Sequence, residues 1–192
     1  MQQLSDAILQ AALEHATQPL TVESGGMHTT PALRLLLLSL ALLSEARTIL
    51  ETGYDGGYTT RILAATGAHV VGVDNGSEYP GVKQDAADML ACYPNVELVW
   101  MDALAYLLQA PADSFDLVFI DDAHQLQHVS EEAKQMRRVL RPGGVAVFHD
   151  TVYCKLAVVL AEVFADWQSL YLPAVSPELG EDMGAGVVRK PS

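Results

Sequence analysis

The sequence predicts an open α/β fold, in which a mostly parallel sheet carries helices on both faces. Two observations support this prediction: short apolar runs alternate with amphipathic segments from Arg47 onward, and most of these runs end in polar or acidic residues. Strands that alternate with helices are typical of a parallel sheet. The chain has 192 residues, which is enough to bury a core without disulfides or metals, so we expect a single domain.

The N-terminal part is predicted to be helical. Helices are expected over Leu4–Ala16 and Pro31–Ser44, with a loop over Gln18–Thr30 between them. Thr30 is the expected cap of the second helix, and the proline after it suits a first turn. This second helix is very apolar, but it contains Arg34 and is shorter than the ~20 apolar residues of a membrane span. We therefore expect it to pack on the sheet.

Five strand–helix repeats and two further strands are expected next. The predicted strands are Arg47–Leu50, His69–Asp74, Val96–Trp100, Phe115–Ile120, a fifth that follows Arg141–Gly144 and ends at His149–Asp150, then Gln168–Leu172 and Gly186–Lys190. The predicted helices are Thr59–Ala65, Val82–Cys92, Ala103–Leu108, Gln127–Leu140 and Tyr153–Asp166. Ligands of open α/β sheets bind outside the carboxyl ends of the strands, so the acidic strand ends should share one crevice.

Composition restricts the partners. The chain has 24 acidic and 11 basic residues, a formal net charge of −13. A nucleic-acid partner needs clustered Lys and Arg, so none is expected, and most of the acidic excess is assigned to solubility. Cys92 and Cys154 cannot form a disulfide framework, and the N-terminus lacks the basic region of a signal peptide. We expect a cytoplasmic protein with no membrane partner.

A glycine-rich turn follows the first predicted strand, in the segment Ile49–Thr60. Gly53 and Gly57 let the backbone come close to a nucleotide-like ligand. Asp55 puts a negative charge inside the turn, and the pyrophosphate-binding pattern G-x-G-x-x-G is absent. These features favour a positively charged adenosyl ligand, and Asp74 at the next strand end suits the two hydroxyls of a ribose.

These motifs resemble those of the class I S-adenosylmethionine-dependent methyltransferases. The resemblance is strongest to small-molecule O-methyltransferases of the catechol O-methyltransferase type and their bacterial natural-product relatives. The segments that resemble the family are Glu51–Thr59, Asp74, Asp102–Ala103, Phe119–His124 and Arg141–Asp150, within roughly residues 27–190. Asp55 is a departure, because many members have a second glycine there.

The resemblance implies a Rossmann-like, seven-stranded sheet whose last strand is antiparallel. It divides the single domain into residues 1–46, N-terminal helices that form a lid over substrate and cofactor, and residues 47–192, the S-adenosylmethionine-binding core. The implied cofactor-binding residues are Met27, Glu51, Gly53, Tyr54, Gly57, Tyr58, Thr59, Asp74, Asn75, Asp102, Ala103 and Asp121. For Met27, packing on the core is the better interpretation on general grounds, and for Tyr54 and Tyr58 it is at least as good as contact with the cofactor.

His124, Asp121 and His149 are the candidate catalytic residues. His124 lies three residues after Asp121, where catechol-type enzymes have a lysine base and several bacterial relatives a histidine. A neutral imidazole can accept a hydroxyl proton at cytoplasmic pH. The alternative is a surface histidine that caps the next helix. His128, one turn later, is expected to face solvent.

Asp121, His149 and Asp150 are also a candidate metal site. Two carboxylates and an imidazole at neighbouring strand ends could hold a divalent ion such as Mg²⁺, although the imidazole weakens a magnesium assignment. Asp122 either adds a ligand or caps the next helix. Without a metal, the same residues could form an acid–base network in which Asp150 orients His149 or His124.

The predicted function is methyl transfer from S-adenosylmethionine to a hydroxyl of a small molecule, such as a phenol or a sugar-like group in secondary metabolism. Two alternatives stay open: a nicotinamide-dependent oxidoreductase, and a non-catalytic adenosylmethionine-binding partner subunit. A homodimer through the N-terminal helices is one option for assembly. The segment Ser176–Gly184 has no pattern that identifies the methyl acceptor.

Overall fold

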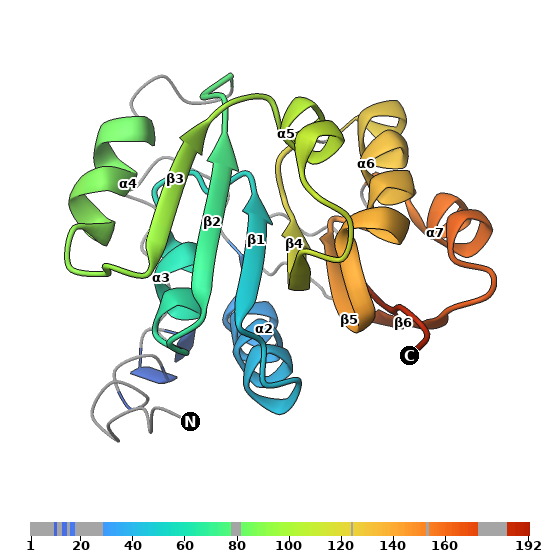
Figure 1. The fold of residues 1–192 in the computed structure, drawn as a ribbon, viewed down its shortest axis with the longest axis horizontal. Coiled ribbons are helices and arrows are strands. Elements are labelled where there is room, and N and C mark those ends of the chain that lie inside the picture. The colour runs from blue at the N-terminus through green and yellow to red at the C-terminus, as the bar shows by residue number, and fades with distance from the viewer. Residues whose placement is uncertain are drawn as a thin grey trace.

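A seven-stranded sheet with strand order β3-β2-β1-β4-β5-β7-β6 forms the centre of the fold (Figure 1). The strands are β1 Thr48–Thr52, β2 His69–Asp74, β3 Val96–Trp100, β4 Phe115–Ile120, β5 Leu140–His149, β6 Gln168–Leu172 and β7 Ala185–Arg189. Strands β1 to β5 pair in parallel, and β7 is antiparallel to both β5 and β6. The predicted seven-stranded sheet with an antiparallel last strand is therefore confirmed.

This computed structural model describes residues 10, 13, 14, 16, 17, 29–77, 82–123, 125–152, 154–172 and 184–192. Met27 and His124, two of the predicted site residues, lie outside the described residues. So do most of the predicted helix Leu4–Ala16 and most of the segment Ser176–Gly184. The predictions made for these parts of the chain stay predictions.

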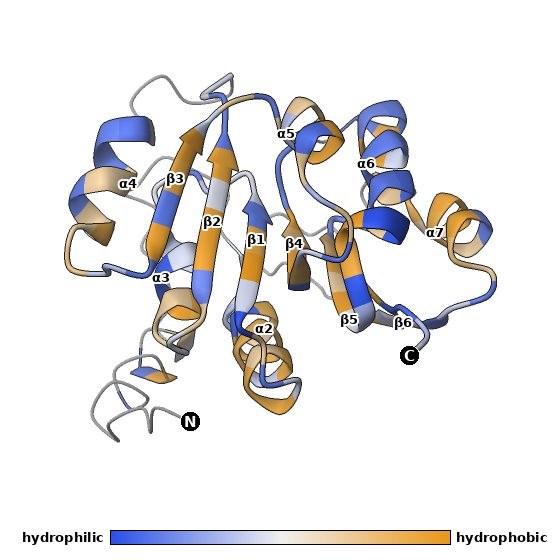
Figure 2. Cartoon of the chain, viewed as in Figure 1, coloured by the Kyte–Doolittle hydropathy of each residue, from blue (hydrophilic) through white to orange (hydrophobic). Residues whose placement is uncertain are grey.

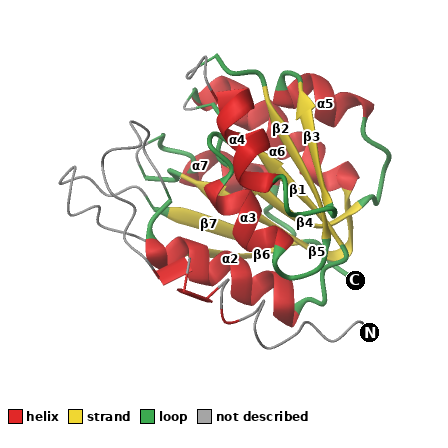
Figure 3. Cartoon of the chain, turned by 90° about the vertical axis from the view of Figure 1, so that its left-hand side faces the viewer, coloured by secondary structure: helices red, strands yellow, loops and turns green. Residues whose placement is uncertain are grey.

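Helices cover both faces of the sheet (Figure 3). They are α2 Pro31–Leu43, α3 Tyr58–Ala64, α4 Val82–Leu90, α5 Ala103–Gln109, α6 Leu126–Val139 and α7 Ala157–Val163. Adjacent residues of a strand point to opposite faces: Ile49 packs in one cluster with Leu37 of α2 and Leu63 of α3, whereas Leu50 packs in another with Leu107 of α5. In Figure 2 the strands are mainly hydrophobic, and α6 is mainly hydrophilic.

Helix α2 begins where the sequence predicts. The Thr30 hydroxyl accepts a hydrogen bond from the Leu33 N–H, and Pro31 occupies the first turn. Leu33, Leu37 and Ala41 of α2 are buried in the core, which confirms that this apolar segment packs on the sheet. Within the described part of the chain, no helix has the length and apolarity needed to cross a membrane.

Most elements lie within two residues of their predicted ranges, and two differ more. Strand β5 begins at Leu140, which pairs with Phe115, and the pairing resumes only at Val145, so the intervening Arg-Pro-Gly-Gly segment bulges from the ladder. Helix α7 begins at Ala157 instead of Tyr153. Lys155 has a φ of 56°, and a right-handed helix cannot include a residue in that conformation.

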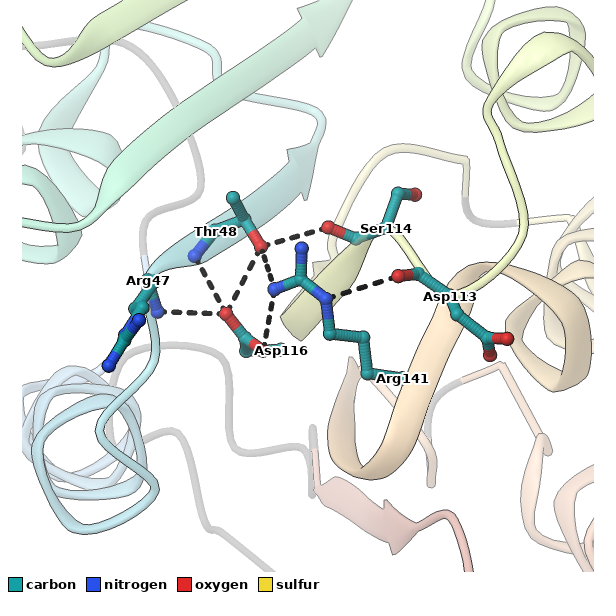
Figure 4. A network of polar contacts seen from close by, with 6 residues as sticks. All are labelled: Arg47, Thr48, Asp113, Ser114, Asp116 and Arg141. Carbon is teal, nitrogen blue, oxygen red and sulfur yellow. Dashed lines mark hydrogen bonds and ion pairs between the residues drawn. The ribbon is translucent and has the colours of Figure 1, made fainter.

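Asp116, on β4, joins three strands at the amino edge of the sheet (Figure 4). Its Oδ2 accepts hydrogen bonds from the backbone N–H groups of Arg47 (2.8 Å) and Thr48 (2.9 Å), and its Oδ1 accepts one from Arg141 Nη1 at 2.8 Å. Burial alone would raise the pKa of Asp116, but the bonds from Arg141, Arg47 and Thr48 hold it below its usual value. One carboxylate thus fixes the entries to β1 and β5 relative to β4.

We expect Asp116→Asn to lower the free energy of unfolding by roughly 1.5–3 kcal/mol, because hydrogen bonds to a charged acceptor are lost. Asp113→Asn is the matched control: its carboxylate is exposed and pairs with Lys190 at 2.9 Å, so its loss should cost less than ~1 kcal/mol. Urea unfolding at pH 7 measures both. Since the folded pKa of Asp116 is lowered, the gap between wild type and Asp116→Asn should shrink as the pH falls through that pKa. A gap that is constant down to pH 2 would contradict this assignment.

Candidate functional site

The predicted site residues that the structure describes gather at the carboxyl edge of the sheet. Glu51 lies in β1, Asp74 ends β2, Asp121 follows β4, and His149 ends β5 with Asp150 directly after it. The pairs Thr52↔Ile120 and Ile120↔Phe148 bring the ends of β1, β4 and β5 level with one another. The shared edge predicted for the acidic strand ends is therefore present.

Gly53 brings the glycine-rich turn against the loop after β4. Its φ is 76°, and a Cβ built at this position would lie 2.3 Å from the backbone oxygen of Asp121 and 2.6 Å from Cα of Asp122. The Gly53 N–H also donates to the Val73 carbonyl at 2.8 Å. Only glycine fits this position without moving the backbone, so the turn and the Asp121 loop are held in direct contact.

The Asp74 carboxylate is held by two backbone groups. Its Oδ2 accepts a hydrogen bond from the Asp55 N–H at 3.1 Å, and its Oδ1 accepts one from the Gly76 N–H at 2.7 Å. Burial raises the pKa of Asp74, and these two bonds oppose the shift. A carboxylate has about four acceptor positions, so each oxygen of Asp74 keeps capacity for one further donor.

Glu51 is enclosed in the protein. Its side chain is 1% exposed, and Thr60 Oγ1 donates to Glu51 Oε2 at 2.5 Å. Burial, opposed by the Thr60 bond and assisted by the Asp121 and Asp74 carboxylates, raises the pKa of Glu51 to about 8. The Glu51 carboxyl is therefore mainly neutral at pH 7.

Three predicted cofactor residues of the turn and α3 are wholly or partly inside the fold. Tyr54 is 3% exposed and packs in a cluster with Ala86 and Leu90 of α4. Thr59 is buried, and its hydroxyl lies 3.0 Å from the hydroxyl of Thr29. Tyr58 is half-buried. Their contact with a cofactor stays a prediction.

Gly57 and three predicted residues after β2 and β3 make local contacts, and their contact with a cofactor stays a prediction. Gly57 is the N-cap residue of α3, with a φ of 82°. Asn75 is exposed and accepts a hydrogen bond from the Ser77 N–H. Asp102 caps α5 by accepting from the Ala105 N–H at 2.9 Å, and Ala103 is buried.

His149 and Asp121 form the shortest polar contact of the candidate catalytic group. His149 Nδ1 lies 2.6 Å from Asp121 Oδ1 and 3.3 Å from Asp150 Oδ1. Asp150 is 3% exposed and adopts a φ of 54°. These three residues each offer a ligand atom within 4.8 Å of the others. The position of His124 relative to them lies outside the described residues.

Cys154 lines the same small cavity as Asp121, His149 and Asp150. Burial, together with the Asp150 and Asp121 carboxylates, raises the pKa of this thiol to about 11. A cysteine nucleophile must be deprotonated to react. The Cys154 thiol is therefore protonated at neutral pH and a poor nucleophile.

A second group lies beside the first and was not predicted. His128 Nε2 lies 3.5 Å from Asp122 Oδ2 and 3.8 Å from Glu132 Oε1, and Glu132 is fully buried. The prediction that His128 faces solvent is wrong: its side chain is 24% exposed and turns toward the strand ends. The helical spacing of His128 and Glu132, four residues apart, was the signal that could have identified this pair. Asp122 does not cap α6, whose N-cap residue is Gln125.

Glu132 carries no charge over most of the pH range. Burial, and then the neighbouring Asp122 carboxylate, raises its pKa well above the usual range for a carboxyl group. Asp122 moves in the other direction: burial opposes the shift, but the contact with His128 lowers its pKa. The pKa of His128 is raised by the same contact. The negative charge of the group is therefore concentrated on Asp122.

Comparisons with known proteins agree with the motifs. A family model described as a methyltransferase domain matches residues 50–151. A protein of Mycobacterium sp. (strain JLS), named "Putative O-methyltransferase", is 34% identical over 151 residues, covering 75% of this chain and 64% of the relative. The chain thus spans less than two thirds of the length of this relative.

Solved structures share the fold. The O-methyltransferase TomG from Streptomyces achromogenes, solved in complex with SAM, superposes with a TM-score of 0.72 at 21% identity, covering 98% of this chain and 91% of that one. The N-methyltransferase NodS from Bradyrhizobium japonicum WM9, in complex with S-adenosylhomocysteine, gives 0.69 at 18% identity, covering 97% of this chain and 100% of that one. The fold therefore accommodates more than one kind of methyl acceptor.

The family match covers the glycine-rich turn, Asp74, and the ends of β4 and β5, which are the segments on which the resemblance was based. The resemblance to methyltransferases is confirmed, and the chain belongs to the methyltransferase domain family.

Proposed function

We propose that this protein transfers a methyl group from S-adenosylmethionine to a hydroxyl group of a small molecule. The observation that carries the proposal is the 2.6 Å contact between His149 and Asp121 at the edge that also holds Asp74. A hydroxyl is a weak nucleophile while it is protonated, so its methylation needs a group that takes its proton. The mycobacterial relative is named as an O-methyltransferase, which supports oxygen as the acceptor atom.

The donor-binding part of the proposal rests on Asp74. Its two backbone hydrogen bonds, from Asp55 and Gly76, fix the carboxylate in place. The remaining acceptor capacity suits a ligand with two adjacent hydroxyl groups, such as a ribose. The carboxylates of Asp55, Asp74 and Asp121 act together on the pKa of Glu51. Their combined negative potential favours a positively charged donor and disfavours a pyrophosphate.

The proton-accepting part rests on His149. When Nδ1 donates to Asp121, the neutral imidazole has its lone pair on Nε2, and the carboxylate stabilises the imidazolium that forms when Nε2 takes a proton. Asp121 therefore orients the base, and Asp150 adds a second carboxylate at 3.3 Å. His124 stays the alternative base predicted from the sequence.

A metal-assisted form of the reaction would use Asp121, His149 and Asp150 as ligands. The 2.6 Å between His149 Nδ1 and Asp121 Oδ1 is a hydrogen-bond distance and is shorter than the roughly 3 Å between two ligand atoms of an octahedral Mg²⁺ site. The three residues as arranged fit an acid–base pair better than a Mg²⁺ site. We therefore assign no step to a metal at this position, and the acid–base form predicts transfer without added Mg²⁺.

The proposal is tested first by donor binding. We expect calorimetry to find binding of S-adenosylmethionine and S-adenosylhomocysteine and none of NADH. Asp74→Asn should weaken the binding of both by at least ~10-fold, because hydrogen bonds to a charged acceptor are lost. Asp85→Asn, at an exposed position of α4, is the matched control and should bind as the wild type does. Tight binding of NADH would favour the oxidoreductase and overturn the proposal.

The role of His149 is tested by substitution with glutamine. His149→Gln should lower kcat by ~100-fold or more, since a general base contributes roughly 10²–10⁴, while affinity for S-adenosylhomocysteine stays unchanged. Initial rates with a panel of phenols and sugars measure this. His69→Gln changes an exposed histidine at the start of β2 and should leave the rate unaltered. Full activity of His149→Gln would transfer the role to His124.

The raised pKa of Glu51 predicts that the stability of the protein depends on pH. The folded pKa of about 8 lies above the unfolded value of 4.5, so the folded state binds more protons between these values and stability should fall as the pH rises from about 5 to 8. At ~1.4 kcal/mol per unit, the difference is at most on the order of 5 kcal/mol. Glu51→Gln copies the neutral carboxyl and should lose this dependence, whereas Glu162→Gln, at an exposed position of α7, should keep it. Urea unfolding at pH 5, 6.5 and 8 compares the three proteins, and parallel curves would contradict the assignment.

A further inference from the structure

Asp122, His128 and Glu132 form a group that the proposed methyl transfer does not use. Asp122 belongs to the loop after β4, one residue beyond Asp121, and the other two lie one turn apart in the first half of α6. Each side chain offers one ligand atom, and the three atoms all lie within 4.8 Å of one another. The group therefore joins the active-site loop to the helix that follows it.

The two distances from His128 do not match hydrogen bonds. His128 Nε2 is 3.5 Å from Asp122 Oδ2 and 3.8 Å from Glu132 Oε1, longer than the 2.7–3.2 Å typical of N–H···O bonds. Ligands at about 2.0–2.2 Å from a tetrahedral cation lie roughly 3.4 Å from each other. The separations are thus close to those of atoms that share one metal ion. In the neighbouring group, His149 and Asp121 are in hydrogen-bond contact at 2.6 Å.

The burial of Glu132 is the second, independent observation. Its side chain is 0% exposed, and both of its carboxyl oxygens, together with His128 Nε2, are buried without a hydrogen-bond partner among the described residues. Buried polar atoms are normally paired, and each one that is unpaired costs about 1–3 kcal/mol. A shared cation would satisfy all three atoms at once.

We propose that Asp122, His128 and Glu132 bind one divalent cation that prefers mixed nitrogen and oxygen ligands, with Zn²⁺ as the best match. One imidazole and two carboxylates suit Zn²⁺, whereas Mg²⁺ and Ca²⁺ favour oxygen alone. Three protein ligands leave a fourth position for water. The ion would tie α6 to the loop that carries Asp121, and so act as a positioning element for the active site.

Zinc binding to the full-length, tag-free, chelator-treated protein tests the proposal. We expect calorimetry with Zn²⁺ to find one site per chain, and Co²⁺ to give visible d–d absorption. Glu132→Gln and His128→Gln should each weaken Zn²⁺ binding by at least ~100-fold, since each removes one of three ligands. Zn²⁺ should raise the Tm of the wild type but not that of Glu132→Gln. Melting of the metal-free variants confirms that they fold, because glutamine copies a neutral glutamic acid at this buried position.

Two controls separate this site from other histidine–carboxylate groups. Asp150→Asn changes the group around His149, and His69→Gln changes an exposed pair in which Nε2 lies 3.7 Å from the Glu97 carboxylate; both variants should bind Zn²⁺ as the wild type does. The proposal is overturned if the wild type binds no Zn²⁺ below millimolar concentration, if Glu132→Gln and His128→Gln retain binding, or if Asp150→Asn loses it. Retained folding with no zinc binding would identify the group as a carboxyl–carboxylate pair that shares a proton.

Discussion

Repulsion among carboxylates at the carboxyl edge of the sheet is the constraint on which the site depends. Burial raises the pKa of Glu51, and the charges of Asp121, Asp74 and Asp55 raise it further. At the opposite edge, Asp116 meets the Arg141 guanidinium and its pKa is lowered. The same sheet thus carries a neutralised carboxylate at one edge, where it stabilises the fold, and a crowded set at the other, where we propose that the donor binds. Crowding of this kind is typical of functional sites.

The negative charge of the carboxylates at this edge is offset in three ways. Glu51 keeps its proton at neutral pH. Asp74 is held by two backbone N–H groups. Asp121 meets the imidazole of His149 at 2.6 Å. In the proposed function, the cationic donor would reduce the repulsion among these carboxylates, whereas a phosphate chain would increase it.

Sequence reasoning succeeded where a single physical signal decided the structure. The strands His69–Asp74 and Phe115–Ile120 match their predicted ranges to the residue, because buried parallel strands are continuous apolar runs with sharp ends. It failed at His128 and Glu132, whose environment depends on how α6 is rotated about its axis. Packing against the sheet sets that rotation. The sequence pattern identifies the apolar face of α6, but it does not show which residues beside that face lie next to the strand ends. The contacts of the cofactor residues depend likewise on packing between elements.

Two aspartates at this edge of the sheet, Asp55 and Asp150, have a left-handed backbone conformation. Asp55 has a φ of 42° and Asp150 a φ of 54°, a region that costs most residues about 1–2 kcal/mol and that aspartate tolerates better than nearly all others except glycine and asparagine. At Asp55, this conformation accompanies an N–H that donates to Asp74. At Asp150, it turns the chain out of β5 and leaves the carboxylate 3.3 Å from His149. Glycine would relieve the strain at both positions and would also remove a carboxylate from the crowded edge. Aspartate satisfies the turn and the charge together, so the strain is retained where the site needs its negative potential.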